Sequence, residues 1–290
     1  MATTQTPHIV VHWLDKSRAQ RILWLLEELD LPYDVELYHR EPLEAPASLR
    51  KIHPLGKSPV ITIAAPPSPS PSPSPSEPKV LAESGFIASY LCTHFAGRPS
   101  HPASSTLVPR KWRAGLEGQP AGETDAWLRH EYLLHYSEGS FFPLIIVKLI
   151  LGLLSTDRVP FFIRPISSFL AAKIAEGYIF PNAKRHLAFL EDMLENPPPG
   201  GEKEGEKEGE GKGGYLCGSS LTAADILMSF PLLIAKSRFA DAGKWEGGSI
   251  ETAFPKLWRY LERLEVEKGY RQSIEKVKEL DGGNYSTSID

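Results

Sequence analysis

A serine at a strand-to-helix transition is the first residue of this chain that could do chemistry. Ser17 lies in HWLDKSRAQRILWLLEEL, residues 12–29, where an apolar strand end runs through a polar loop into a strong helix pattern. With Gln20 it has the S-x-x-Q spacing of a capping box, in which the serine oxygen accepts a hydrogen bond from the helix backbone. Its own O–H would then remain available to donate to an anion at the same helix end. The sequence leaves both roles open.

Two further stretches place polar side chains beside turns. In HPLGKSPVI, residues 53–61, Pro59 follows a glycine-containing turn and begins a strand, because a proline without an N–H fits a strand only at an end or an edge. In LAESG, residues 81–85, Glu83 and Ser84 stand where a strand gives way to a helix. These two residues fit a helix cap, and a helix N-terminus is also a natural site for an anion.

The elements that position these residues follow an alternating pattern. Apolar residues recur with helical spacing after Ser17, and Leu31-Pro32 ends that helix. The expected strands are 8–12, 33–38, 60–63 and 79–82, and the expected helices are 17–30, 47–52 and one from residue 84. The opening β-α-β unit favours parallel strands joined by a right-handed crossover. The whole order, βαβ-α-ββα, predicts an α/β thioredoxin-like domain over residues 1–97.

Low-complexity stretches indicate how the rest of the chain is divided. Alternating proline and serine at 66–76 cannot form a helix or a central strand, so we expect residues 66–78 to be an exposed insertion in a hairpin turn. Residues 98–122, rich in Gly, Pro and Ser, are expected to link two domains. An all-α domain is predicted over 123–290, with a charged Gly/Glu/Lys loop at 200–214.

Two features of the helical part have a structural interpretation. Residues 124–154 form one long apolar-faced pattern, which we expect to bend near Pro143. Thr222 and Asp225 have the spacing of a capping box at the start of an apolar helix. We assign this second pair to folding and not to catalysis.

Composition narrows the class of protein. The net charge of −4 and the pI of about 6.2 argue against nucleic acid or an anionic membrane as the main partner. The two cysteines are far apart and form no CxxC, which favours a reducing compartment, and the N-terminus has no pattern of a secretory signal. The run LIIVKLILGLL, residues 144–154, is too short to span a bilayer and contains Lys148, so we expect a buried helix and leave peripheral membrane contact open.

Four stretches together resemble the cytosolic-type glutathione transferase superfamily: SRAQRILWLLEELDLPYDVELY, HPLGKSPVI, LAESGFIASYL and YLCGSSLTAADILMSFPL. The middle region HYSEGSFFPLIIVKLIL is similar to the fungal branch of that family, typified by a yeast enzyme associated with the endoplasmic reticulum. The resemblance covers nearly the whole chain apart from the insertions and the linker. It implies an α/β thioredoxin-like N-terminal domain followed by an all-α domain.

The resemblance also implies a glutathione site in the first domain. Ser58 would pair its backbone N–H and C=O with the cysteinyl part of glutathione in β fashion, beside Pro59, which is cis in the family. Lys57 would meet the glycyl carboxylate, and His53 would either assist it or be a loop histidine that caps the local backbone. No metal is implied.

The γ-glutamyl end of glutathione would lie at the second strand-to-helix junction. Ser84, at a helix N-terminus, would hold the α-carboxylate, and Glu83 would pair with the α-amino group. Catalysis needs the thiolate, and a hydroxyl donor at a helix N-terminus lowers the thiol pKa from its usual value of about 8.5. In serine-type relatives the activating hydroxyl often lies three residues before the Ser-Arg pair, where this chain has Leu14. Either Ser17 or the backbone N–H groups of residues 15–17 would therefore stabilise the thiolate.

Candidate residues of the substrate pocket come from both domains. They are Leu14, Tyr132, Tyr136 and Phe141. An aromatic stripe at helical spacing is more often core than pocket, so the three aromatic residues have both interpretations. His12, at the first strand, is expected to be a packed strand residue.

The resemblance implies an enzyme of the glutathione transferase type. It would conjugate glutathione to electrophiles, with reduction of organic hydroperoxides as a second activity, and would act as a homodimer in the cytoplasm, with a peripheral position at the endoplasmic reticulum considered. Two alternatives stay open: a non-catalytic transferase-like protein serving regulation or scaffolding, and a pathway-specific enzyme that adds glutathione to, or isomerises, one biosynthetic intermediate. The expected partners are glutathione and a small electrophile.

Overall fold

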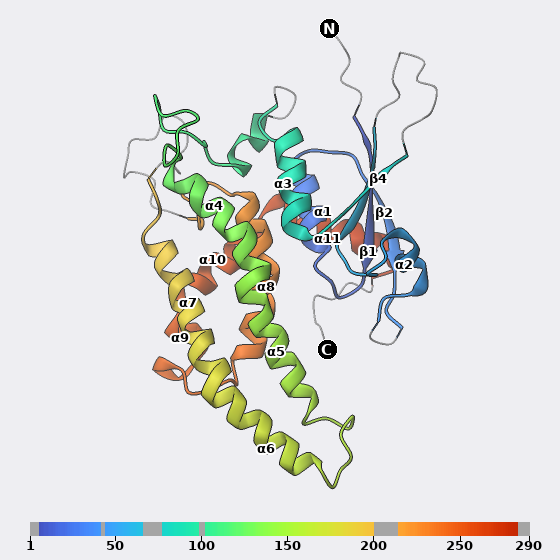
Figure 1. Ribbon diagram of the computed structural model, residues 1–290, viewed down its shortest axis with the longest axis vertical. Helices are drawn as coiled ribbons and strands as arrows, with labels where there is room; N and C mark the ends of the chain where they lie inside the picture. Colours follow the sequence, from blue (N-terminus) through green and yellow to red (C-terminus); the bar gives the residue numbers. More distant parts are fainter. Residues whose placement is uncertain (1–5, 42–43, 66–76, 99–101, 200–213, 284–290) are drawn as a thin grey trace. The chain divides into compact units, whose positions relative to one another are not determined.

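The computed structural model describes residues 6–41, 44–65, 77–98, 102–199 and 214–283 (Figure 1). It divides into two compact units. The first comprises residues up to Leu107 together with the chain from Val266 onward, and the second comprises Val108–Glu265. The Pro/Ser run at 66–76 and the charged loop up to residue 213 lie outside the described residues.

The first unit contains a four-stranded sheet in the order β2-β1-β3-β4. Its elements are β1 (His8–Leu14), α1 (Gln20–Glu28), β2 (Asp34–Tyr38), α2 (Ala47–Ile52), β3 (Val60–Ala64), β4 (Lys79–Ala82), α3 (Ser84–Phe95) and α11 (Lys268–Leu280). Strands β1 and β2 are parallel, and β3 pairs antiparallel with both β1 and β4. This order of elements confirms the predicted thioredoxin-like domain. Parallel neighbours require a long connection, and helix α1 provides it between β1 and β2.

Helix α1 is the centre of this unit. It packs against β1, α3 and α11, so that even the side chains of Trp24 and Arg21 are fully buried. The ring of Trp24 meets Tyr270 of α11 edge to face at 5.2 Å. The sequence predicts that residues 266–290 belong to the helical domain, whereas the structure groups the chain from Val266 onward with the first unit. The apolar residues of α1 need a cover on the side away from the sheet, and α11 supplies it.

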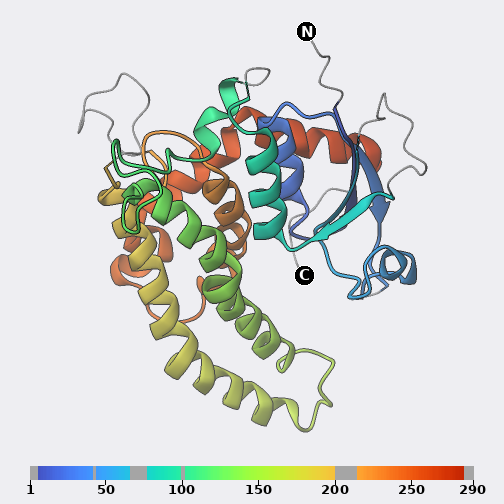
Figure 2. The same cartoon turned by 45° about the horizontal axis from the view of Figure 1, so that its top comes forward.

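The second unit is helical. Its helices are α4 (Asp125–Tyr136), α5 (Phe142–Leu153), α6 (Arg164–Ile174), α7 (Phe180–Glu195), α8 (Ala223–Phe239), α9 (Ile250–Ala253) and α10 (Pro255–Val266). Helices α4 and α5 both pack on α8, whose side chains are buried along most of its length. Figure 2 shows α4 and α5, and likewise α6 and α7, following one another as two long bent rods.

Both bends have the same local cause. Wider π-turns, η2 at Ser137–Phe141 and η3 at Ala175–Ile179, stand immediately before α5 and α7. Each of these helices has a proline in its first turn, Pro143 or Pro181. Proline has no N–H for the carbonyl one turn earlier, and a π-turn relieves that mismatch within a continuous helix. The bend predicted near Pro143 lies at the first of these π-turns.

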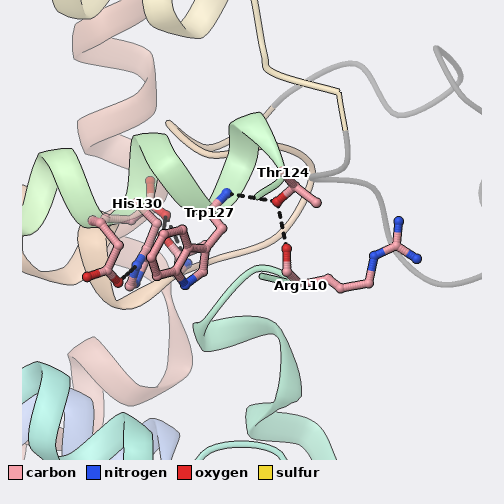
Figure 3. A network of polar contacts seen from close by, with 7 residues as sticks. Arg110, Thr124, Trp127 and His130 are labelled. Atoms are coloured by element: carbon pink, nitrogen blue, oxygen red, sulfur yellow. Dashed lines mark hydrogen bonds and ion pairs between the residues drawn. The ribbon is translucent and has the colours of Figure 1, made fainter. Parts of the chain in front are cut away.

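The N-termini of α4 and α8 are both capped by threonine. Thr124 Oγ1 accepts from the Trp127 N–H at 3.2 Å and donates to the Arg110 carbonyl at 2.6 Å, which ties the start of α4 to the preceding loop (Figure 3). At α8 the predicted capping box is confirmed, with the Thr222 N–H donating to Asp225 Oδ2 at 2.8 Å. Asp225 is fully buried, and its other oxygen accepts from the Tyr260 hydroxyl at 2.7 Å.

Candidate functional site

The turn between β1 and α1 holds Ser17 in a buried position. Lys16, just before it, has a φ of +48°, a left-handed conformation that costs a non-glycine residue about 1 kcal/mol. Ser17 Oγ accepts from the Ala19 N–H at 3.2 Å. Arg40, which follows β2, stabilises the turn, because its Nε donates to the Asp15 carbonyl at 3.2 Å. A strained and braced turn fixes the direction of the Ser17 side chain.

The predicted capping box of Ser17 and Gln20 is wrong. Helix α1 begins at Gln20 with Ala19 as the flanking residue, so Ser17 lies outside the cap position. The Gln20 amide turns away from the helix end and its Nε2 lies 3.5 Å from Ser273 Oγ of α11. The serine stabilises the turn before the helix, and the glutamine serves the contact with α11.

The Ser17 hydroxyl points to the loop before β3. It donates to Ser58 Oγ at 3.0 Å, and both serines are buried. The Ser58–Pro59 peptide bond is cis, as the family resemblance implied. In this way the structure brings the predicted catalytic serine and the predicted glutathione-binding serine into direct contact.

His53, Lys57 and Gly56 form the rest of this loop. Lys57 is exposed, while His53 is half-buried and its Nδ1 has no hydrogen-bond partner among the described residues. Gly56 has a φ of +55°, and a Cβ there would lie 2.7 Å from Arg50 Cγ. The tight turn that glycine allows therefore keeps His53, Lys57 and Ser58 within one short loop.

The second predicted anchor lies between β4 and α3. Glu83 is exposed and has a φ of +71°, a second strained non-glycine residue, and Ser84 is buried as the first residue of α3. Arg21 of α1, whose side chain is fully buried, donates from Nη2 to Ser84 Oγ at 2.9 Å. Sequence reasoning missed Arg21. The one available signal was a cation on the otherwise apolar face of α1.

His12 belongs to the sheet that supports this site. Its Nδ1 lies 3.1 Å from the Tyr38 hydroxyl and its Nε2 lies 3.3 Å from Thr62 Oγ1. Burial lowers the pKa of His12, against the opposing effect of Glu36. The interpretation of His12 as a packed strand residue agrees with these contacts.

The four candidate pocket residues lie in both units. Leu14 is buried in a cluster with Tyr38 and Leu49 of the first unit. In the second unit Tyr136 and Phe141 are core residues with stacked rings 6.0 Å apart, and Tyr132 beside them is 47% exposed. A role of these four in a substrate pocket stays a prediction.

In the parts of the chain that the structure describes, no group of three or more His, Cys, Asp or Glu side chains is placed to hold a metal ion.

Comparison with known proteins identifies the family. The family model of the glutathione S-transferase N-terminal domain matches residues 17–94, and that of the C-terminal domain matches residues 171–263. Glutathione S-transferase 1 of Saccharomyces cerevisiae is 32% identical over 280 residues, covering 96% of this chain and 99% of the relative. The chain belongs to the glutathione S-transferase family. Glutathione S-transferase 3 of Schizosaccharomyces pombe is 28% identical, over 93% of this chain and 88% of the relative.

Solved glutathione S-transferase structures agree with the fold. A glutathione S-transferase from Actinobacillus pleuropneumoniae has a TM-score of 0.58 at 25% identity and covers 92% of both chains. Ure2p5 from Phanerochaete chrysosporium, crystallised with 1-(S-glutathionyl)-2,4-dinitrobenzene, has a TM-score of 0.57 at 16% identity, over 99% of this chain and 100% of the other. In this glutathione S-transferase the match to the N-terminal domain lies within the first unit, and the match to the C-terminal domain lies within the second.

Proposed function

We propose that this protein binds glutathione on its first unit, ionises the thiol and transfers the sulfur to an electrophilic carbon. The observation that carries the proposal is the pair of polar junctions in that unit. One is the hydrogen bond of Ser17 to Ser58 beside cis-Pro59, and the other is that of Arg21 to Ser84 at the start of α3. The matches to glutathione S-transferases support the same activity.

Glutathione would lie across the two junctions. The backbone of Ser58 would pair with the cysteinyl part, and Lys57 and His53 would face the glycyl carboxylate. The γ-glutamyl carboxylate would accept from Ser84 at the N-terminus of α3, where the helix dipole and the buried Arg21 both favour negative charge. Glu83 would pair with the α-amino group.

The chemical step then needs a donor for the sulfur. The thiol loses its proton to solvent, and a hydroxyl donor stabilises the thiolate that remains. The Ser17 O–H, which donates to Ser58 Oγ in the structure, would turn to the sulfur. The thiolate forms the new carbon–sulfur bond, and the leaving group departs with the electron pair of the bond that breaks.

The decisive experiment is glutathione binding followed by turnover. We expect calorimetry to detect glutathione binding. On the same sample we expect conjugation of glutathione to 1-chloro-2,4-dinitrobenzene, and reduction of cumene hydroperoxide by two glutathione molecules is assayed beside it. Binding without turnover of any electrophile or peroxide would favour the non-catalytic alternative. Turnover of one biosynthetic electrophile alone would favour the pathway-specific alternative.

We also propose that the enzyme is a homodimer of the fungal type that detoxifies electrophiles in the cytoplasm. The yeast relatives support the fungal assignment. Sedimentation of the purified protein tests the dimer, and fractionation of cells with an antibody to the chain tests the compartment.

A further inference from the structure

The hairpin formed by α5, α6 and the turn between them carries apolar side chains on its outside. Most of the large apolar side chains that are exposed in the described parts of the chain lie between Val147 and Tyr178. At the turn, Phe161 is 80% exposed and Phe162 is 67% exposed. A soluble surface rarely gathers such side chains into one area, and a contiguous patch indicates that something covers it.

The exposed residues of α6 form one stripe. Ile163, Ile166, Leu170 and Ile174 follow one another at three- and four-residue steps, so they share a face of the helix. Phe169 stands beside the stripe and is 65% exposed. Ala171 is buried, and Ser167 Oγ donates to the Leu154 carbonyl at 2.7 Å, so the side of α6 that carries these two residues faces inward while the stripe faces outward.

Several backbone groups of the turn between the two helices are hydrogen-bonded within the turn. Thr156 Oγ1 donates to the Leu153 carbonyl at 2.8 Å, and Arg164 Nη2 donates to the Val159 carbonyl at 3.1 Å. The Val159 N–H in turn donates to the Thr156 carbonyl at 3.2 Å. Groups that are paired in this way enter an apolar medium without the penalty of an unsatisfied hydrogen bond.

The charge of the hairpin end differs from that of the whole chain. The chain carries −4, whereas residues 152–174 contain Arg158, Arg164 and Lys173 against Asp157 alone, a net charge of +2. Lys173 pairs with Glu176 at 2.9 Å, which leaves Arg158 and Arg164 as the basic residues on either side of the exposed phenylalanines. Basic residues that flank exposed aromatic and aliphatic side chains are typical of segments that lie in the headgroup region of anionic membranes.

The helix Asp125–Leu153 is long and apolar enough to cross a membrane by length and composition alone. Its inner residues Leu133, Phe141 and Ile145 belong to the core of the second unit, however, and Lys148 is paired with Asp241 at 3.1 Å. A helix that is committed to the bundle along one face does not span a bilayer. The exposed end of the hairpin, which extends beyond the other helices of this unit in Figures 1 and 2, is the part that is available.

We propose that the α5–α6 hairpin end is a membrane-docking surface that inserts Phe161, Phe162 and the outer stripe of α6 into the interface of an anionic bilayer. Arg158 and Arg164 then lie at the level of the lipid phosphates. The protein lies on the membrane through this surface and does not cross it. The proposal is independent of the glutathione site, whose residues all lie in the first unit.

Vesicle flotation of the full chain tests the proposal. The wild-type protein is expected to float with vesicles of phosphatidylcholine and phosphatidylserine and to bind pure phosphatidylcholine more weakly. The variant Phe161→Ser/Phe162→Ser should lose more than about tenfold in vesicle affinity, because each buried aromatic ring contributes to interfacial binding. Arg158→Gln should weaken binding about fivefold on anionic vesicles only.

A matched control uses apolar residues of similar exposure outside the hairpin. Leu128→Ser/Leu280→Ser removes two side chains that are 46% and 49% exposed, and vesicle affinity should be unchanged. Conjugation of 1-chloro-2,4-dinitrobenzene in vesicle-free buffer should be equal in wild type and in both double variants. If the wild type shows no turnover, the proposed function is contradicted, but the vesicle measurements still test the docking surface.

A labelling experiment gives an independent readout. Both native cysteines are buried, so Phe161→Cys introduces one accessible thiol for an environment-sensitive fluorophore. A blue shift and rise in emission on addition of phosphatidylserine vesicles are expected. Absence of wild-type binding, or binding that survives loss of both phenylalanines, overturns the proposal. A change of sedimentation mass in the double variant without vesicle binding also overturns it, because a second copy then covers the surface.

Discussion

Ser17 Oγ donates a hydrogen bond to Ser58 Oγ at 3.0 Å, which joins the turn before α1 to the loop that carries cis-Pro59. The same oxygen of Ser17 accepts from the Ala19 N–H. A lone pair of the Ser17 oxygen therefore already accepts a hydrogen bond from the backbone. The O–H is directed toward Ser58, beside which the cysteinyl part of glutathione would lie. The role of Ser17 therefore depends on which acceptor its hydroxyl bonds when glutathione binds, Ser58 Oγ or the thiolate.

Ser17→Ala should raise the pKa of enzyme-bound glutathione by about one unit, because a hydrogen bond to a charged group contributes about 1.5–3 kcal/mol. The ultraviolet absorbance of the thiolate, measured against pH, reports this pKa directly. Ser58→Ala is the matched control, since it removes the same hydrogen bond and leaves the Ser17 hydroxyl in place. A bound thiol that titrates identically in wild type and Ser17→Ala would assign thiolate stabilisation to the backbone N–H groups.

Arg21→Lys should weaken glutathione binding by about tenfold. Lysine retains the charge but loses the planar donors that reach Ser84, and its hydration makes burial more costly. Calorimetric titration with glutathione measures the effect, and the free energy of unfolding in urea is measured in parallel. If Arg21 is purely structural, the variant will lose stability while the folded fraction binds glutathione as the wild type does.

Asp225→Ala should lower the free energy of unfolding by about 4 kcal/mol, because four buried donors lose their acceptor. These donors are the N–H and the hydroxyl of Thr222, the N–H of Leu216 and the hydroxyl of Tyr260. Urea denaturation measures the loss. Asp225→Asn keeps one carbonyl acceptor and should lose less, and equal losses in the two variants would contradict the assignment to hydrogen bonding.

Acidification should destabilise the fold through His12. Burial lowers its pKa in the folded chain, so the unfolded chain binds a proton first as the pH falls. Stability from this residue is complete above the ordinary histidine pKa and decreases below it, by at most about 1.4 kcal/mol per pH unit. Chemical denaturation between about pH 7 and pH 5 measures the slope.

His12→Gln should flatten that slope only in part, because the half-buried His186 remains. The pKa of His186, which hydrogen-bonds Tyr136 at 2.6 Å, is also lowered by burial and contributes in the same window. A second measurement on His186→Gln then tests whether His186 causes the slope that remains in His12→Gln. A slope that does not change in the first variant rules out His12 as the source.

The sequence by itself determined what depends on neighbouring residues. The periods that indicate strands and helices, and the capping box of Thr222 and Asp225, each depend on residues only a few positions apart. The order of the elements follows from these local signals. Turn chemistry around Gly56 and Pro59 is equally local, and family resemblance assigned the glutathione-binding residues to these turns. Local geometry restricts the backbone strongly, so such patterns can be interpreted without the fold.

Only the tertiary structure decided which distant groups meet. Gln20 matched a capping box by spacing, yet its amide faces Ser273 of the last helix, which lies far away along the chain. The burial of Arg21 against Ser84 and the contact of Ser17 with Ser58 likewise depend on the packing of α1 between other elements. The same holds for the outward stripe of α6, because a hydrophobic period predicts an apolar face but not whether another element covers it.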